Sequence, residues 1–286
     1  MTALAHVGWW PDWTLFGDAL ATGAWLGLVL PWLGVLLLLR QQVFVAAAIG
    51  QAANLGVALA MAFAALFGAC PLHVSGASSP AWVVAASVLP AVLAAWAALR
   101  AGDGTRAAIE ARSAVVFLVG SAGAMVALAN QPHGAQELQR LFLSSLLSAG
   151  PTDAWLAAGA AAVVAAALWS RPRALVAWAA DPRTARAHGV PTRRLDFAAA
   201  IVVGVVVGQA LLATGLLYTF AAMTLPVFAA RGLARSLRGV VLLAPVFGVG
   251  GQAAAFALAH RFDLPPGQVA VLVYAALAAA AGLRRR

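Results

Sequence analysis

Long apolar runs make up most of the chain, and short polar segments separate them. A helix needs about 20 apolar residues to cross a bilayer, and nine runs come close to or exceed that length. They cover residues 19–39, 43–69, 81–99, 113–130, 154–169, 197–215, 216–230, 239–259 and 269–283. This pattern predicts an all-α fold, a polytopic transmembrane helical bundle of about 8–9 spans.

Two stretches depart from the rule of one run per span. Residues 197–230 are too long for one span and short for two, so we expect a turn at Gly215 and a broken or tilted helix at Pro226. Residues 141–147 are too short to cross and are expected to be interfacial or re-entrant. The gaps between the runs leave no room for a soluble domain. Residues 1–286 are therefore expected to form a single transmembrane domain.

A polar island interrupts the apolar pattern in the loop formed by residues 170–196. Asp181 is a good N-cap, Pro182 occupies the first helical position, and Gly189 is a helix stop. These signals predict a short helix. Because a span lies on each side, the helix cannot cross the bilayer and is expected to lie on the membrane surface, where a soluble partner could push on it.

The arginines predict which side of the membrane each loop faces. All 18 basic residues are Arg. If the first span runs from outside to inside, only Arg140 and Arg261 fall on the outer side, which leaves 16 of the 18 inside. We therefore expect an external N-terminus and a cytoplasmic C-terminus. Residues 1–18, which include Trp9, Trp10 and Trp13, are expected to form an external interfacial segment.

Composition supports a membrane protein and argues against several function classes. The chain is 63% hydrophobic and only 9% charged, whereas soluble proteins carry roughly 25% charged residues. The net charge of +9 follows from the inner arginines, so nucleic acid is not an expected partner. Without lysine, the chain has no P-loop lysine and no Schiff-base lysine. We expect no catalytic residue, no cofactor and no ATP hydrolysis by this chain itself.

Four motifs in the C-terminal third carry a family resemblance. They are Ala187–Val190 (AHGV), Gly215–Pro226 (GLLYTFAAMTLP), Arg231–Arg238 (RGLARSLR) and Phe262–Gly267 (FDLPPG). In order and spacing they resemble the permease subunit of the zinc and manganese ABC importers, the ABC-3 metal transporter family. The segments 33–40 and 56–58 also resemble it, whereas residues 71–180 resemble it weakly.

The resemblance implies a permease that works by ATP-driven alternating access in the inner membrane. Its expected partners are a second copy of itself, a cytoplasmic ABC ATPase that hydrolyses the ATP, an extracytoplasmic solute-binding protein and the lipid bilayer. The implied substrate is a divalent transition metal, Zn or Mn, or its complex. Residues 170–196 then form the cytoplasmic coupling loop. The residues expected to couple it to the ATPase are Asp181, Arg183, Arg186, His188, Gly189 and Val190.

The chain departs from the family pattern on the second span. Where the family has an aspartate and a histidine as inferred metal ligands, this sequence has Ala47 and Gln51. Gln51 and Asn54 stand at i and i+3 on one helical face and could offer neutral oxygens. They are candidates for the substrate path, or for interhelical hydrogen bonds that hold the bundle together. Divalent transition metals prefer imidazole and carboxylate ligands, so the metal ligands stay unknown.

Other readings stay open from the sequence. A secondary transporter or channel for a small polar solute would need no ATPase, but such proteins commonly carry ionisable residues within the membrane, and these spans have almost none away from their ends. The pairs Gly23/Gly27 and Gly204/Gly208 could pack helices within the subunit or at a dimer contact. Asp263, which precedes Leu-Pro-Pro-Gly, is interpreted as the cap of the last span.

Overall fold

The computed structural model describes residues 13–66, 81–100, 106–129, 131, 136, 139, 141 and 146–283. Eleven α-helices and one 3-10 helix form within these ranges, which contain no β-strand. The elements are α1 (Trp13–Leu39), α2 (Val43–Leu66), α3 (Ala81–Arg100), α4 (Arg106–Ala129), η3 (Leu146–Ser148), α6 (Pro151–Ser170), α7 (Pro172–Ala180), α8 (Pro182–Ala187), α9 (Thr192–Thr214), α10 (Leu216–Leu233), α11 (Leu237–Phe262) and α12 (Pro266–Leu283). The all-α class is confirmed.

Nine of the described helices are long and apolar enough to cross a membrane, namely α1–α4, α6 and α9–α12. The expected turn at Gly215 is confirmed, because this residue separates α9 from α10 with φ of 81°. Of the two alternatives expected at Pro226, a broken or a tilted helix, the break is wrong, since α10 continues through this residue to Leu233. A membrane helix tolerates such a proline when neighbouring helices enclose it, and Pro226 is buried here.

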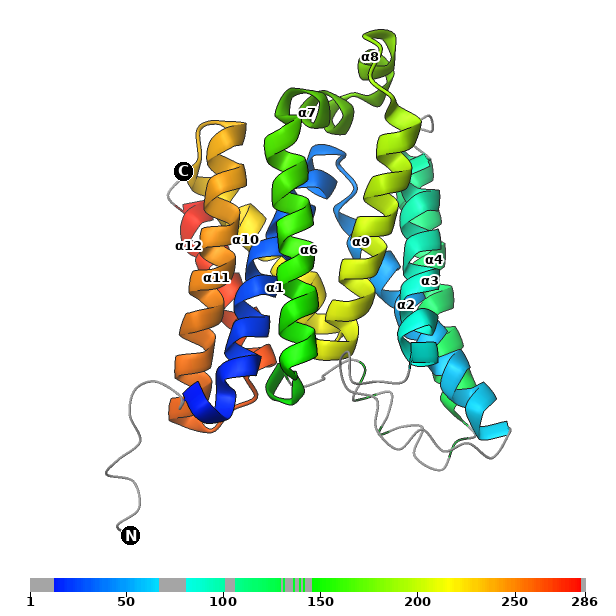
Figure 1. Cartoon of the computed structure of the whole chain (residues 1–286), viewed down its shortest axis with the longest axis vertical. Coiled ribbons are helices and arrows are strands. Elements are labelled where there is room, and N and C mark those ends of the chain that lie inside the picture. Colours follow the sequence, from blue (N-terminus) through cyan, green and yellow to red (C-terminus); the bar gives the residue numbers. More distant parts are fainter. Residues whose placement is uncertain are drawn as a thin grey trace.

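The spans pack as two neighbouring groups around a shared apolar core (Figure 1). In one group α1 packs on α11 and α10 packs on α12; in the other, α2 packs on α3 and α4, and α3 packs on α9. Helix α6 lies against α1 and also contacts α9. At the top of Figure 1, α7 lies across the end of the bundle and α8 projects beyond it.

Glycines allow two of these helix pairs to approach closely. A Cβ atom placed on Gly27 would lie 2.9 Å from the carbonyl oxygen of Gly248, where α1 crosses α11. A Cβ atom on Gly204 would lie 2.5 Å from the Cα atom of Val92, where α9 crosses α3. Of the two roles considered for these glycine pairs, the structure therefore supports packing within the chain.

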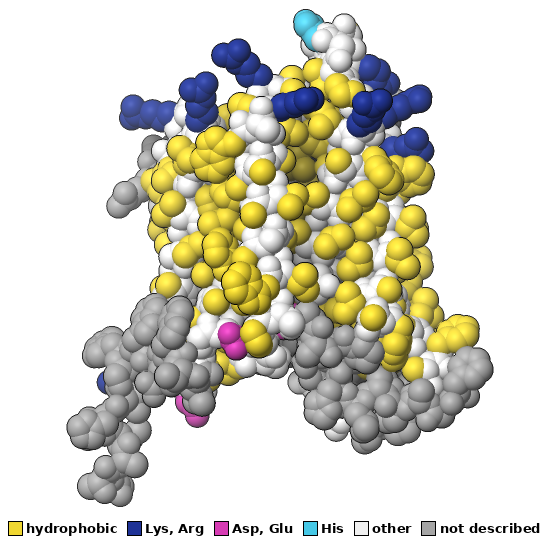
Figure 2. All heavy atoms as spheres, viewed as in Figure 1, with side chains coloured by type: hydrophobic (Ala, Val, Ile, Leu, Met, Phe, Trp, Pro, Cys, Tyr) yellow, Lys and Arg dark blue, Asp and Glu magenta, His cyan; other side chains and the backbone are white. Residues whose placement is uncertain are grey.

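Charge and apolar surface are separated along the bundle (Figure 2). Arginine side chains gather at the end that carries α7 and α8, and apolar side chains cover the flank below them. The described arginines at the ends of α3 and α10 and at the starts of α7, α9 and α11 belong to this end. Such an arrangement is typical of the cytoplasmic side of a membrane protein, although the sidedness stays a prediction.

Several sequence predictions concern residues outside the described ranges. They include the interfacial tryptophans Trp9 and Trp10, Arg140 and most of the 141–147 stretch. Asp263 is described, and its interpretation as the cap of the last span is wrong. It ends α11 instead, in a left-handed conformation with φ of 52°, and its N–H donates to the carbonyl of Ala259. The last span, α12, begins three residues later at Pro266.

Candidate functional site

Helix α8 is the short surface helix that the sequence predicted. The Asp181 carboxylate accepts hydrogen bonds from the backbone N–H groups of Arg183 and Thr184, at 3.0 and 3.2 Å. The Thr184 hydroxyl also donates to this carboxylate. That hydrogen bond, followed by the backbone N–H of Thr184, lowers the pKa of Asp181 below its usual value. The exposed carboxylate is thus ionised and caps the helix.

The C-terminal end of α8 is closed by a Schellman motif. Val190 N–H donates to Ala185 O at 3.0 Å, and Gly189 N–H donates to Arg186 O at 3.1 Å. Gly189 adopts φ of 80°, a conformation that side-chain-bearing residues rarely take. Both ends of α8 therefore have defined caps, so the helix holds its shape although most of it is exposed.

The six predicted coupling residues lie together at α8 and the turn that follows it. Asp181, Arg183, Arg186, His188 and Gly189 are exposed, and Val190 is half-buried. The Arg186 Nε atom donates to the Thr192 hydroxyl at 3.1 Å, which ties α8 to the first turn of α9. The His188 ring lies over its own helix, with Nδ1 2.9 Å from Thr184 O. These exposed polar groups lie on the element that projects beyond the end of the bundle in Figure 1.

Sequence reasoning missed helix α7, which precedes α8 and packs against it. Its N-terminal signal was available, since Pro172 occupies the first helical turn. Trp178 and Ala179 form its buried side. They join Ala185 of α8 in a small apolar cluster that also contacts α1 and α9. The surface element is therefore a pair of helices, α7 and α8, held on the bundle by a tryptophan.

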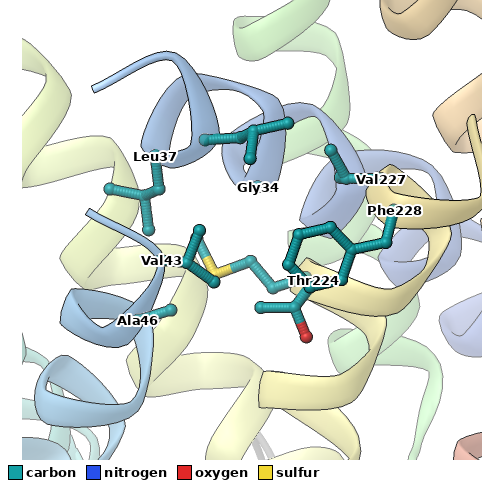
Figure 3. Close-up of a pocket in the computed structure, with 9 residues that line it drawn as sticks. Gly34, Leu37, Val43, Ala46, Thr224, Val227 and Phe228 are labelled. Atoms are coloured by element: carbon teal, nitrogen blue, oxygen red, sulfur yellow. The ribbon is translucent and has the colours of Figure 1, made fainter. Parts of the chain in front are cut away.

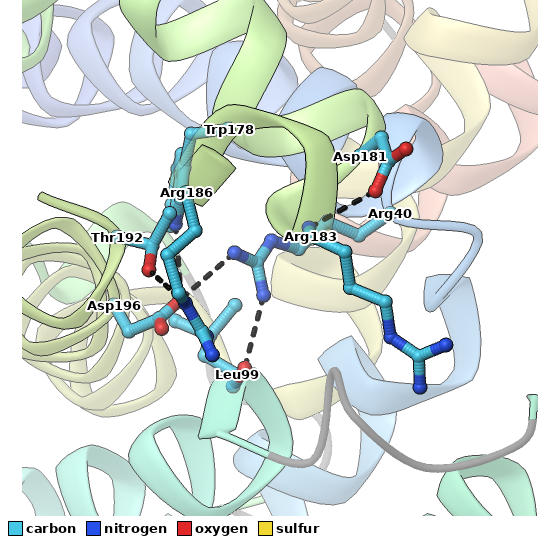
Figure 4. Close-up of polar contacts among 8 residues, drawn as sticks. All are labelled: Arg40, Leu99, Trp178, Asp181, Arg183, Arg186, Thr192 and Asp196. Carbon is cyan, nitrogen blue, oxygen red and sulfur yellow. Dashed lines mark hydrogen bonds and ion pairs between the residues drawn. The ribbon is translucent and has the colours of Figure 1, made fainter. Parts of the chain in front are cut away.

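A buried ion pair lies beneath the two helices (Figure 4). Arg40, which follows α1, donates from Nη2 to Asp196 Oδ1 of α9 at 2.8 Å and from Nη1 to Leu99 O of α3 at 3.0 Å. The Trp178 indole N–H donates to the same Asp196 oxygen at 3.0 Å. The Arg40 guanidinium carbon stands 4.2 Å from the Trp178 ring centre, in cation–π geometry. Four elements thus meet at one arginine.

Burial sets the electrostatics of this cluster. The Arg40 side chain is 2% exposed and the Asp196 side chain 9%. Loss of hydration lowers the pKa of Arg40, and the charge and hydrogen bond of Asp196 oppose that shift. The guanidinium remains charged, because arginine does not lose its proton in proteins. A charge held in this way depends on its partner for nearly all of its stabilisation.

The proposed substrate-path residues are enclosed in the bundle. Gln51 is 1% exposed and Asn54 0%. Asn54 Nδ2 donates to Gln51 Oε1 at 3.3 Å, within the same helix. Helix α4 packs closely on Gln51, since a Cβ atom on Gly120 would lie 2.8 Å from Gln51 O. The Asn54 side-chain oxygen Oδ1 is buried and has no hydrogen-bond partner among the described residues. The pair is enclosed by neighbouring spans, and its role in the substrate path stays a prediction.

Two cavities lie between the described spans. One, of about 10 Å³, lies between α1, α2 and α10, and its lining is almost wholly apolar (Figure 3). The Thr224 hydroxyl at its edge donates to Phe220 O of its own helix. The second, of about 70 Å³, lies between α1, α6 and α9, where Thr22, Asp153 and Gln209 line it. Within the described ranges, no three His, Cys, Asp or Glu residues cluster as metal ligands.

The described residues form a bundle of nine candidate membrane spans with a capped helix, α8, at its arginine-rich end, which is the architecture of a multi-pass membrane protein. The chain belongs to the ABC 3 transport family, whose model matches residues 13–284. This membership makes it a permease of the ABC importer class. No curated protein matches the chain.

Solved structures share the fold. PsaBC from Streptococcus pneumoniae in complex with Fab aligns with a TM-score of 0.70 at 19% identity, over 93% of this chain and 90% of that chain. A transporter assigned to the metal-chelate type of ABC transporters, in an inward-facing conformation, also aligns with a TM-score of 0.70, at 14% identity, over 92% of this chain and 84% of that chain. At these identities the likeness extends to the fold alone.

Proposed function

We propose that this chain is the membrane-spanning subunit of an importer for a divalent transition metal, Zn or Mn, or for a complex of such a metal. In this proposal residues 1–286 are one permease domain in the inner membrane, with an external N-terminus and a cytoplasmic C-terminus. Two copies pair and work with a cytoplasmic ABC ATPase, which hydrolyses the ATP, and with an extracytoplasmic solute-binding protein. Family membership supports the transport class.

The observation that carries the mechanism is the pair of surface helices. Helix α8 has a carboxylate cap at one end and a Schellman motif at the other, so it is a rigid, exposed element. It lies at the end where the arginines gather (Figure 2). We assign coupling to Asp181, Arg183, Arg186, His188, Gly189 and Val190. Closure of the ATPases would push on this element and move the spans between two arrangements.

The chemistry of α2 bears on the form of the substrate. Gln51 and Asn54 offer neutral oxygens and amide groups, and Ala47 offers no ligand. A bare divalent cation bound there would lose its hydration shell without gaining a carboxylate or imidazole ligand. If these residues line the path, weak binding of the free ion follows. A complex that keeps its own ligands around the metal would avoid that cost.

The test is uptake by reconstituted vesicles. The permease is purified together with its ATPase, and metal accumulation is measured by elemental analysis with and without ATP. We expect accumulation only when both ATP and the ATPase are present. Uptake by the permease alone, driven by an ion gradient, would instead identify a secondary transporter. ATP-driven uptake of a solute that contains no metal would refute the substrate assignment and leave the transport class intact.

A further inference from the structure

We propose that the buried cluster of Arg40, Asp196 and Trp178 is the joint that transmits movement of α7 and α8 to the membrane spans. The residues act by positioning helices and touch no substrate. This inference rests on the proposed function, because a transmission joint has a role only if a partner pushes on the surface helices. The three residues are buried and are distinct from the coupling residues of α8 and the turn that follows it.

Arg40 connects the ends of three spans. Arg40 reaches α9 through Asp196 and α3 through the Leu99 carbonyl, at 2.8 and 3.0 Å. Because Arg40 directly follows α1, its guanidinium links three spans that are distant in sequence. Arg40 and Asp196 are 156 residues apart in the chain. Charge-assisted hydrogen bonds fix both distance and direction, so these three helix ends cannot shift independently while the bonds persist.

Trp178 connects helix α7 to the ion pair. The Trp178 side chain is 1% exposed, and its N–H donates to the Asp196 oxygen that Arg40 also uses. Its ring lies against the Arg40 guanidinium. Trp178 therefore contacts both members of the ion pair. Displacement of α7 must either carry the ion pair with it or break these contacts.

Helix α8 is connected to the same cluster and to α9. Ala185 of α8 packs in the same apolar cluster as Trp178, and Leu36, Leu39 and Ala199 of the spans line that cluster. The bond from Arg186 to Thr192 ties α8 to the first turn of α9. Asp196 lies one turn further along α9. The two surface helices are thus attached to α9 at two successive turns and to α1 at its last turn.

The ion pair suits transmission better than simple stabilisation. A buried ion pair contributes little net stability compared with apolar residues of the same size, because both charges lose their hydration. Apolar contacts alone would allow the helices to slide, whereas a guanidinium with several directed bonds permits few arrangements. Networks with discrete arrangements are the physical means by which a push at one site reaches another.

The test compares uptake per ATP hydrolysed in the reconstituted complex. Asp196→Asn removes the charge opposite Arg40 and keeps an oxygen that can accept from Trp178. Arg193→Gln is the matched control, because Arg193 is exposed and lies one turn earlier on the same helix. We expect Asp196→Asn to lower metal uptake per ATP by roughly tenfold, with faster amide hydrogen exchange across residues 172–187. The control should change neither.

A second variant separates transmission from folding. The double change Arg40→Gln with Asp196→Asn leaves no unpaired buried charge, so thermal stability should recover relative to Asp196→Asn alone. Uptake per ATP should stay low, because Gln is too short to link the three helix ends. Restored uptake in the double variant, or normal uptake in Asp196→Asn, would refute the proposal that this cluster transmits movement to the spans. Absence of ATP-driven uptake in the wild-type complex would refute the proposed function instead.

Discussion

Substitution of Gly248 by alanine tests one of the closest helix contacts in the described part of the bundle. A Cβ atom on this residue would lie 1.8 Å from the carbonyl oxygen of Gly27 on α1 and 2.8 Å from Cγ of Pro31. An ordinary contact between carbon and oxygen is about 3.3 Å. The two helices would therefore have to separate by about 1.5 Å, because the Gly27 oxygen belongs to the backbone and cannot rotate away.

That separation would weaken packing along the whole crossing. A gap of 0.5 to 1 Å already forfeits about a quarter to a half of the dispersion energy of the atoms that line it. The Gly248 carbonyl also accepts from the Tyr274 hydroxyl at 2.8 Å, so a shift of α11 strains its contact with α12. Overpacking of this kind costs about 1–3 kcal/mol. We expect the midpoint of thermal unfolding to fall by roughly 2–12 °C.

The assay is thermal unfolding of the purified protein in one detergent, followed by circular dichroism. Gly250→Ala is the matched control, because it stands on the same helix, is exposed, and a Cβ atom there meets nothing within 4 Å. Alanine favours a helix more than glycine, so the control should unfold at the wild-type temperature or above it. If Gly248→Ala and Gly250→Ala unfold at the same temperature, the close contact between α1 and α11 is wrong.

Three further outcomes follow from the fold and the surface helices. Reporters fused to the two ends of the chain should lie on opposite sides of the membrane, with the C-terminus cytoplasmic, because the number of spans is odd. If both ends lie on one side, one of the nine candidate spans does not cross the membrane. Gly189→Pro and Arg186→Glu should each uncouple ATP hydrolysis from uptake while the protein stays in the membrane, and unchanged uptake in both would exclude α8 as the coupling element. Ala47→Asp combined with Gln51→His should create binding of free Zn²⁺ or Mn²⁺, measured by calorimetry. Tight binding by the unmodified protein that survives loss of Gln51 and Asn54 would place the ligands elsewhere, with His260 and Asp263 the next residues to change.

The spans and helix α8 could be predicted because short-range rules determine them. Apolar length alone defines a span, since every backbone polar group in lipid must be satisfied within a helix. Asp181, Pro182 and Gly189 act within a few residues of one another, so their order in the sequence is enough to predict the helix that they bound. The turn at Gly215 followed from the same local logic.

The ion pair and the helix pair depend on tertiary packing that local signals do not reveal. Arg40 could be assigned to one side of the membrane, but its partner is 156 residues away and is a single acidic residue at the start of a basic and apolar helix. The break at Pro226 was expected from local chemistry, and burial among other spans overrides it. Gln51 and Asn54 could be placed on one face, yet only the packing of the neighbouring spans shows that they are enclosed.

If a separate ATPase acts on α7 and α8, the two proteins must touch at these helices, and site-specific cross-linking detects that contact. In a background with Cys70→Ala, Arg183→Cys places a single thiol on the exposed surface of α8, and Arg261→Cys places one on the last turn of α11. A thiol-to-amine cross-linker is then added to vesicles that contain the permease and its ATPase. A covalent product with the ATPase is expected from Arg183→Cys and none from Arg261→Cys. A product from Arg261→Cys alone, or equal products from both, would contradict this expectation.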